Sequence, residues 1–178
     1  PTKGTLTKEE EWLKAIAPAT VDSWPATTLS YNSQGNVTTG TDALGRTTTT
    51  AYDPTGTYVT QITNVRSHAR SFTYDPRFGQ VTTTTDPNSQ VTTTTYDVFG
   101  RLDKVYGPLT TATQPTLQHT YTIGSPLSAT TGCHRVAVGG TETFCQTSFT
   151  DGLGRTIQVR SPAEDLTNQV VTGTVEKR

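Results

Sequence analysis

The sequence predicts an all-β fold made of antiparallel β-hairpin repeats, a meander or spiral sheet preceded by a short N-terminal helix. Three observations lead to this prediction. A tyrosine followed by a turn recurs about every 22 residues, turn sequences recur about every 11 residues, and threonine makes up about a quarter of the chain. Each repeat is expected to be one hairpin, which cannot bury its own face and therefore needs its neighbours.

Residues 1–28 are expected to form a helix and a linker. Thr7 to Glu10 matches a capping box, a pattern that often begins a helix. The apolar face of the helix would consist of Trp12, Leu13, Ile16 and Ala17. We expect this helix to cover the first exposed strand edge, and docking of a partner chain is the alternative.

Regular repeats are expected over residues 29–107. In their turns, Asp or Asn can cap the backbone through its side chain, Pro presets φ, and Gly supplies a positive φ. Between the turns lie β-branched runs of strand length, such as 80–85 and 90–96. The residues that define the repeats are Tyr31 and Gly35; Tyr52, Asp53 and Gly56; Tyr74, Asp75 and Gly79; and Tyr96, Asp97, Gly100 and Arg101. Each tyrosine ring is expected to cover a turn glycine while its hydroxyl finds a polar partner or solvent.

The threonine-rich strands look polar on both sides, a composition that leaves strand register loose. The turns must then determine the register. A sheet of this kind tolerates water on at least one face, which suits the wall of a large hollow body better than the centre of a globule.

Irregular repeats are expected over residues 108–178, where the units become longer. Tyr121 and Phe149 continue the aromatic period weakly. The turn after Tyr121 has no Gly-Arg pair, and Phe149 is expected to take the place of the tyrosine.

Cys133 and Cys145 flank Gly139-Gly140, a dipeptide typical of hairpin turns. A three- or five-residue loop would place the two cysteines directly opposite each other. A disulfide in an oxidising compartment and two free thiols both remain open. Zinc held by both cysteines and His134 is a third, weaker alternative, because adjacent residues on a strand point to opposite faces.

The unit Tyr96-Asp97-Val98-Phe99-Gly100-Arg101 resembles the YD repeat of Rhs proteins, which also occurs in the B and C components of insecticidal toxin complexes and in teneurins. The resemblance extends over roughly residues 29–162, with Asp151 to Arg155 as a late variant. It implies a long β-ribbon that winds into a spiral. In complete family members this ribbon closes into a shell around a toxic C-terminal polypeptide.

The expected function is therefore structural: a β-repeat segment of a secreted or cell-surface bacterial protein, forming part of an encapsulating shell. Its expected partners are the remaining repeats and the cargo domain of the parent chain. The alternative is a carbohydrate-binding or adhesive module that contacts cell-surface glycans through Tyr52, Tyr74 and neighbouring threonines. A net charge of -1 gives no footprint for nucleic acid, and no apolar run is long enough to span a membrane. We assign no catalytic residue, no metal and no cofactor, and we expect no enzyme activity.

Overall fold

The structure is a computed structural model that describes residues 4–11, 25–110, 113–124, 127–137, 139–163 and 169–173. These residues form fourteen β-strands and no helix, and every strand pair with a described register is antiparallel. The predicted all-β hairpin fold is therefore confirmed. The chain divides into two units, Pro1–Gln90 and Val91–Arg178.

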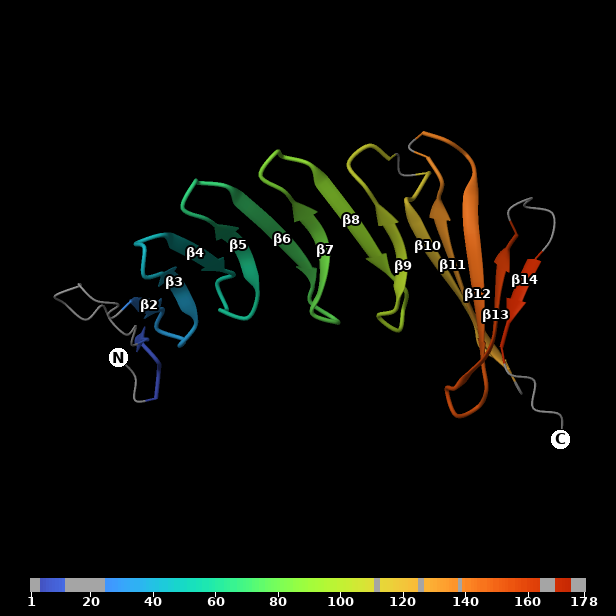
Figure 1. Ribbon diagram of the computed structural model, residues 1–178, viewed down its shortest axis with the longest axis horizontal. Helices are drawn as coiled ribbons and strands as arrows, with labels where there is room; N and C mark the ends of the chain where they lie inside the picture. The colour runs from blue at the N-terminus through green and yellow to red at the C-terminus, as the bar shows by residue number, and fades with distance from the viewer. Residues whose placement is uncertain are drawn as a thin grey trace, which may run out of the picture. The chain divides into compact units, whose positions relative to one another are not determined.

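In the first unit, each strand pairs with the next strand in the chain, as Figure 1 shows. The hairpins are short, and the strands have five to seven residues apart from the first, which has three. The strands are β1 (Lys8–Glu10), β2 (Ala26–Tyr31), β3 (Val37–Thr41), β4 (Thr47–Tyr52), β5 (Val59–Thr63), β6 (Ala69–Asp75) and β7 (Gln80–Thr85).

The second unit has the same order of pairing, and its middle strands are longer. The β11–β12 hairpin pairs eight residues of each strand without a register shift. The strands are β8 (Val91–Tyr96), β9 (Leu102–Tyr106), β10 (Leu117–Thr122), β11 (Ser128–Arg135), β12 (Thr143–Thr150), β13 (Thr156–Pro162) and β14 (Gln169–Thr172).

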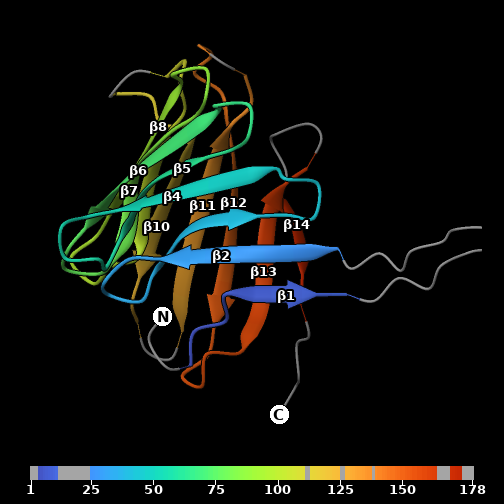
Figure 2. The same cartoon turned by 90° about the vertical axis from the view of Figure 1, so that its left-hand side faces the viewer.

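The expected capping box is wrong, because Lys8–Glu10 forms the edge strand β1, which pairs with β2 (Figure 2). Lys8 lies opposite Thr28 and Glu10 opposite Ala26. The outer edge of β2 offers unpaired backbone groups, and pairing with them forms hydrogen bonds without the cost of nucleating a helical turn. The apolar face expected from Trp12 to Ala17 lies outside the described residues.

The first unit has two unlike faces, which corrects the expectation of strands that are polar on both sides. Residues directly opposite across a strand pair project from the same face. One face, here called the threonine face, carries Thr28, Thr39, Thr41, Thr47, Thr49, Thr63 and Ser71. The other, here called the apolar face, carries Leu29, Tyr31, Tyr52, Ile62, Phe72 and Tyr74 among further threonines.

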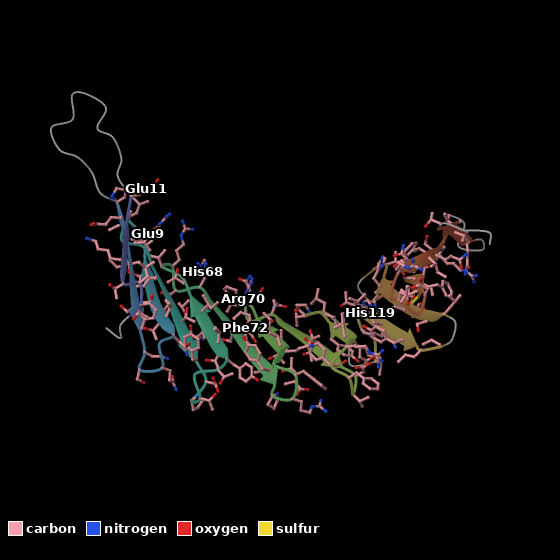
Figure 3. The ribbon with its side chains drawn as sticks, turned by 90° about the horizontal axis from the view of Figure 1, so that it is seen from below. Glu9, Glu11, His68, Arg70, Phe72 and His119 are labelled. Carbon is pink, nitrogen blue, oxygen red and sulfur yellow. A yellow bond between two sulfur atoms is a disulfide. The ribbon has the colours of Figure 1, made fainter. Side chains whose placement is uncertain are left out.

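The apolar face is not covered by a second layer within the described residues. No hydrophobic side chain among them is fully buried, and Ile62 stays 39% exposed. Arg70, opposite Ile62, and Phe72 project from this face and are labelled in Figure 3. Each hairpin thus contributes a strip of sheet whose stability comes from backbone pairing, turns and ring contacts.

Candidate functional site

The repeated Asx turn is the feature that orders the hairpins. In the Asp97 turn, the carboxylate Oδ1 accepts the backbone N–H groups of Phe99 and Arg101, both at 2.9 Å. The Gly100 N–H bonds the Asp97 carbonyl at 3.0 Å, and Gly100 has a φ of 75°. A side-chain acceptor at the first position and a left-handed residue at the fourth together close a tight three-residue loop with a glycine bulge.

The same side-chain pattern recurs at turns whose first residue is Asp or Asn. In each of them Oδ1 accepts the N–H two residues on and the N–H four residues on. These first residues are Asn32, Asp42, Asn64, Asp86, Asp97 and Asp151. Asp53 uses both carboxylate oxygens for a similar cap. The Asp75 turn is one residue longer, and Gly79 donates to the Asp75 carbonyl at 2.8 Å.

Two serines take the glycine position in the turns that lie midway through a repeat. Ser67 and Ser89 have φ values of 61° and 62° and follow Asn64 and Asp86 by three residues. The sequence reasoning, which looked for glycine, missed both. The spacing after Asn64 and Asp86 is the signal that could have found them.

An arginine completes three of these turns through a forked ion pair. The guanidinium groups of Arg46, Arg101 and Arg155 each donate from Nε and Nη2 to Oδ2 of the turn aspartate. The Arg46 side chain is the main cause of the lowered pKa of Asp42, and the Arg155 backbone N–H is the main cause at Asp151. Burial of Asp97 raises its pKa, but the hydrogen bonds from Arg101 outweigh this effect, so the pKa of Asp97 is also lowered. These arginines therefore stabilise the turns in which they lie.

Tyrosine hydroxyls tie one repeat to the next. The Tyr52 hydroxyl donates to the Val37 carbonyl at 3.0 Å, and Val37 lies opposite Tyr31. The Tyr121 hydroxyl donates to the Leu102 carbonyl at 3.0 Å, and Leu102 lies opposite Tyr96. In both units a tyrosine therefore bonds the backbone opposite the tyrosine that begins the preceding repeat. We call this contact the tyrosine latch.

The ring of Tyr74 is also engaged within the sheet. It stacks on Tyr58, with ring centroids 4.8 Å apart, and the Tyr58 ring covers Gly79. The ring that covers this turn glycine thus belongs to Tyr58, a residue that the repeat period did not select. Because Tyr52 and Tyr74 already have partners, they are poor candidates for an open glycan platform.

Each tyrosine of the regular repeats also marks a β-bulge. The register shifts by one residue between Ser30 and Tyr31, and again at Tyr52, Tyr74 and Tyr96. A bulge increases the local twist of a strand pair and bends it. The recurring turn therefore determines register and curvature together.

Cation–π contacts occur in both units, and the sequence reasoning did not predict them. The Arg101 guanidinium lies 4.1 Å from the centroid of the Tyr121 ring and 5.1 Å from that of Phe99. Such contacts contribute about 0.5–1 kcal/mol at exposed sites. Arg101 therefore joins its own turn to the Tyr121 latch.

Phe149 does not take the tyrosine position. The Asp151 turn has the usual caps, so the residue directly before it is Thr150, whose hydroxyl donates to the Ser128 carbonyl at 3.5 Å. Phe149 lies one residue earlier and packs under the Arg160 guanidinium, 4.8 Å away. Counting back from the aspartate locates the position better than the nearest aromatic residue.

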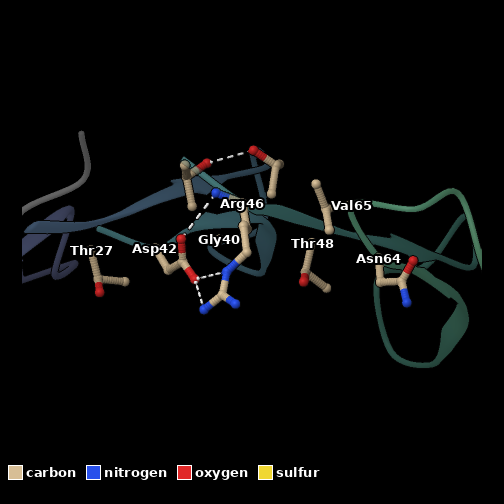
Figure 4. Close-up of a pocket in the computed structure, with 9 residues that line it drawn as sticks. Thr27, Gly40, Asp42, Arg46, Thr48, Asn64 and Val65 are labelled. Carbon is tan, nitrogen blue, oxygen red and sulfur yellow. Dashed lines mark hydrogen bonds and ion pairs between the residues drawn. The ribbon is translucent and has the colours of Figure 1, made fainter. Parts of the chain in front are cut away.

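A shallow hollow lies beside the Asp42 turn and is shown in Figure 4. Thr27, Gly40, Thr48, Asn64 and Val65 line it together with Asp42 and Arg46. The two charged groups pair with each other, so the hollow presents hydroxyl and amide groups and no activated nucleophile. Its geometry supports no catalytic step.

Cys133 and Cys145 lie directly opposite each other in the β11–β12 hairpin, with Cα atoms 4.0 Å apart, and their sulfur atoms form a disulfide. His134 faces the other side of the sheet, where its ring lies 5.1 Å from that of Phe144. The three side chains predicted as a weaker zinc alternative are therefore not brought together. Among the described residues, no group of three or more His, Cys, Asp or Glu could hold a metal ion.

None of the described residues belongs to a helix long and apolar enough to cross a membrane. A comparison with curated proteins finds no significant match. Among solved structures, the crystal structure of TcdB2-TccC3-TEV matches 92% of this chain with a TM-score of 0.63 and 14% identity. The structure of the Photorhabdus luminescens Tc holotoxin pore with a mutated TccC3 matches 84% of the chain, with a TM-score of 0.43 and 14% identity.

The chain spans only 13% and 10% of the two matched chains. At this identity the first match concerns the fold. The family model for the RHS Repeat matches residues 31–67 and 74–116, the region of the regular turns. The matched residues 31–67 and 74–116 therefore consist of RHS repeats, and the recurring Asx turn is the structural feature that they share.

Proposed function

We propose that this chain is a structural segment of a secreted or cell-surface bacterial protein and forms part of a shell around a polypeptide cargo. The observation that carries the proposal is a sheet without a core of its own. Successive hairpins pair in chain order, and no hydrophobic side chain of the described residues is fully buried. Such a sheet extends by adding repeats, as a wall does, because each repeat contacts only its neighbours.

The proposed mechanism is sequestration and involves no chemical step. Backbone pairing would give the wall continuity, while the Asx turns and tyrosine latches would hold neighbouring hairpins in register. The fold likeness to TcdB2-TccC3-TEV and the Rhs repeats support this proposal. The partners would be further repeats of the parent chain and its enclosed segment.

The test is protease protection of the full-length parent protein. We expect the segment that follows the repeats to resist proteinase K in the intact protein. It should become sensitive when residues 29–107 are replaced by a flexible linker of equal length. Equal sensitivity in both proteins would reject encapsulation.

The glycan alternative is tested separately on a glycan array with this chain. Saturable binding that is lost in both Tyr52→Ala and Tyr74→Ala variants would replace the shell proposal with a binding function. Binding no higher than background would remove the alternative.

A further inference from the structure

The β11–β12 hairpin lacks the Asx turn that determines register in the regular repeats. Its connection has no Asx cap, and its closing backbone bonds run from Val136 N–H to the Glu142 carbonyl and from Gly140 N–H to the Ala137 carbonyl. Its strands pair over eight residues each, and Thr131 and Thr147 share a hydroxyl hydrogen bond of 2.9 Å. A longer turn that is not capped determines register less strictly than a tight Asx turn.

The strands themselves tolerate a shift. A slip of two residues keeps every side chain on its own face, and strands rich in small polar residues lose little from such a slip. In β11 and β12, Thr130 lies opposite Ser148, and a slip of two residues would place it opposite Thr150 or Gln146, which are also polar. Among the described residues of this hairpin, the disulfide between Cys133 and Cys145 is the contact that is compatible with a single register.

Arg135 adds a second, weaker restraint at the same end of the hairpin. Its guanidinium donates to the Gly140 carbonyl, and Nε and Nη2 donate to the Pro115 carbonyl, both at 3.2 Å. It thus links the β11–β12 connection to the segment that precedes β10. These bonds hold the connection in place but do not cross-link the two strands.

We propose that the Cys133–Cys145 disulfide is a redox-controlled register lock: the hairpin stays closed in an oxidising compartment and loosens when the bond is reduced. The reductant would be a dithiol. One of its thiolates attacks a cysteine sulfur and breaks the S–S bond, and its second thiol then resolves the mixed disulfide. Two electrons pass to the protein, Cys133 and Cys145 become thiols, and the dithiol leaves as a cyclic disulfide. This inference does not depend on the proposed shell function.

The size of the effect follows from the closed loop. The two cysteines are 12 residues apart in sequence. Cross-linking a loop of this length removes enough freedom from the opened state that reduction should increase hairpin opening on the order of 100-fold. The hairpins of the first unit that are closed by Asx turns contain no cysteine and should not respond.

The experiment measures hydrogen–deuterium exchange of the full chain with and without the dithiol dithiothreitol. We expect exchange in residues 128–135 and 143–150 to accelerate on the order of 100-fold on reduction, with no change in residues 69–85. A Cys133→Ser/Cys145→Ser double variant should exchange like the reduced chain and ignore the dithiol. Because this variant lacks the disulfide, it tests the proposal even if dithiothreitol does not reach the bond.

Tryptic mapping of the denatured, oxidised chain supplies a second measurement. Cleavage after Arg135 separates the two cysteines, so a linked peptide pair that divides on reduction is expected. The proposal is overturned if this pair is absent from the oxidised chain, or if the double variant exchanges like the oxidised chain. It is also overturned if residues 69–85 accelerate equally, because the disulfide would then support the whole chain and not one hairpin.

Discussion

The β3–β4 and β11–β12 hairpins close by different means. In β3–β4 a local sequence, Asp42 to Arg46, supplies the cap, the left-handed glycine and the ion pair. In β11–β12 the strands are longer, the connection has no Asx cap, and a disulfide joins two directly opposite residues. The β3–β4 hairpin can thus carry its register in the turn, whereas β11–β12 needs a contact within its strands.

The largest expected difference between these hairpins concerns two matched glycines. Gly45 and Gly139 have φ values of 75° and 74°, and neither has an atom within 4 Å of an added Cβ. Valine is strained at such a φ by about 1–3 kcal/mol. Gly45→Val should open β3–β4, whereas Gly139→Val should leave β11–β12 closed because the disulfide holds its register. Hydrogen exchange of each hairpin measures this.

The control for this pair is Gly45→Asn, because asparagine adopts a left-handed conformation more readily than valine. It should have a much smaller effect than Gly45→Val. Equal opening of β11–β12 in the Gly139→Val variant would contradict the comparison.

The next effect concerns the cap itself. Asp97→Ala removes the acceptor of two backbone N–H groups and of the Arg101 side chain, and should destabilise β8–β9 by about 1–2 kcal/mol. Urea unfolding of the chain, read together with local exchange, gives the value. Asp97→Asn keeps Oδ1 and should cost less, as the natural Asn32 and Asn64 turns suggest.

Glu142→Ala is the matched change in the β11–β12 connection. Only the backbone carbonyl of Glu142 takes part in closing that hairpin, so the substitution should change stability by less than about 0.5 kcal/mol. A larger loss would show that side chains of this connection contribute to closure.

A smaller effect is expected from the tyrosine latch. Tyr52→Phe removes the hydroxyl that donates to the Val37 carbonyl and should cost about 1 kcal/mol, the usual net contribution of one hydrogen bond. Urea unfolding measures the loss. Tyr58→Phe keeps the stacked ring against Tyr74 and serves as the control, with little change expected. Similar losses in both variants would mean that the bond from the Tyr52 hydroxyl to the Val37 carbonyl makes no specific contribution.

The smallest effect is a pH dependence confined to capped turns. Hydrogen bonds, led by those from Arg46 at Asp42 and from the Arg155 backbone at Asp151, lower the pKa of these carboxyl groups from 3.8. A lowered folded-state pKa stabilises the fold above the unfolded-state value and loses that contribution as the pH falls through the folded-state pKa. Amide exchange by NMR between about pH 5 and pH 2, corrected for intrinsic rates, should show β3–β4 loosening below about pH 4, with β11–β12 unaffected. A parallel response of β11–β12 would contradict this assignment.

Much of the molecule could be predicted from the sequence, because its information is local. An Asx residue, a residue with positive φ three positions later and an arginine after it form a turn within one short stretch, so the hairpins and the strands between them follow directly. The helix expected from the N-terminal capping box was wrong because a non-local contact overrode the local pattern. Its local signal was genuine, but the open edge of β2 offered Lys8–Glu10 a strand partner that no local pattern reveals.

The sequence by itself determined the hairpin period, the turn chemistry and the all-β class, since each depends on neighbouring residues. Only the tertiary structure decided which side chains share a face, because a bulge at each tyrosine of the regular repeats shifts the alternation by one residue. It also decided that the Tyr52 hydroxyl bonds the Val37 carbonyl and that Cys133 lies opposite Cys145. These contacts join separate strands, and strand register, which brings them together, is a property of the folded sheet.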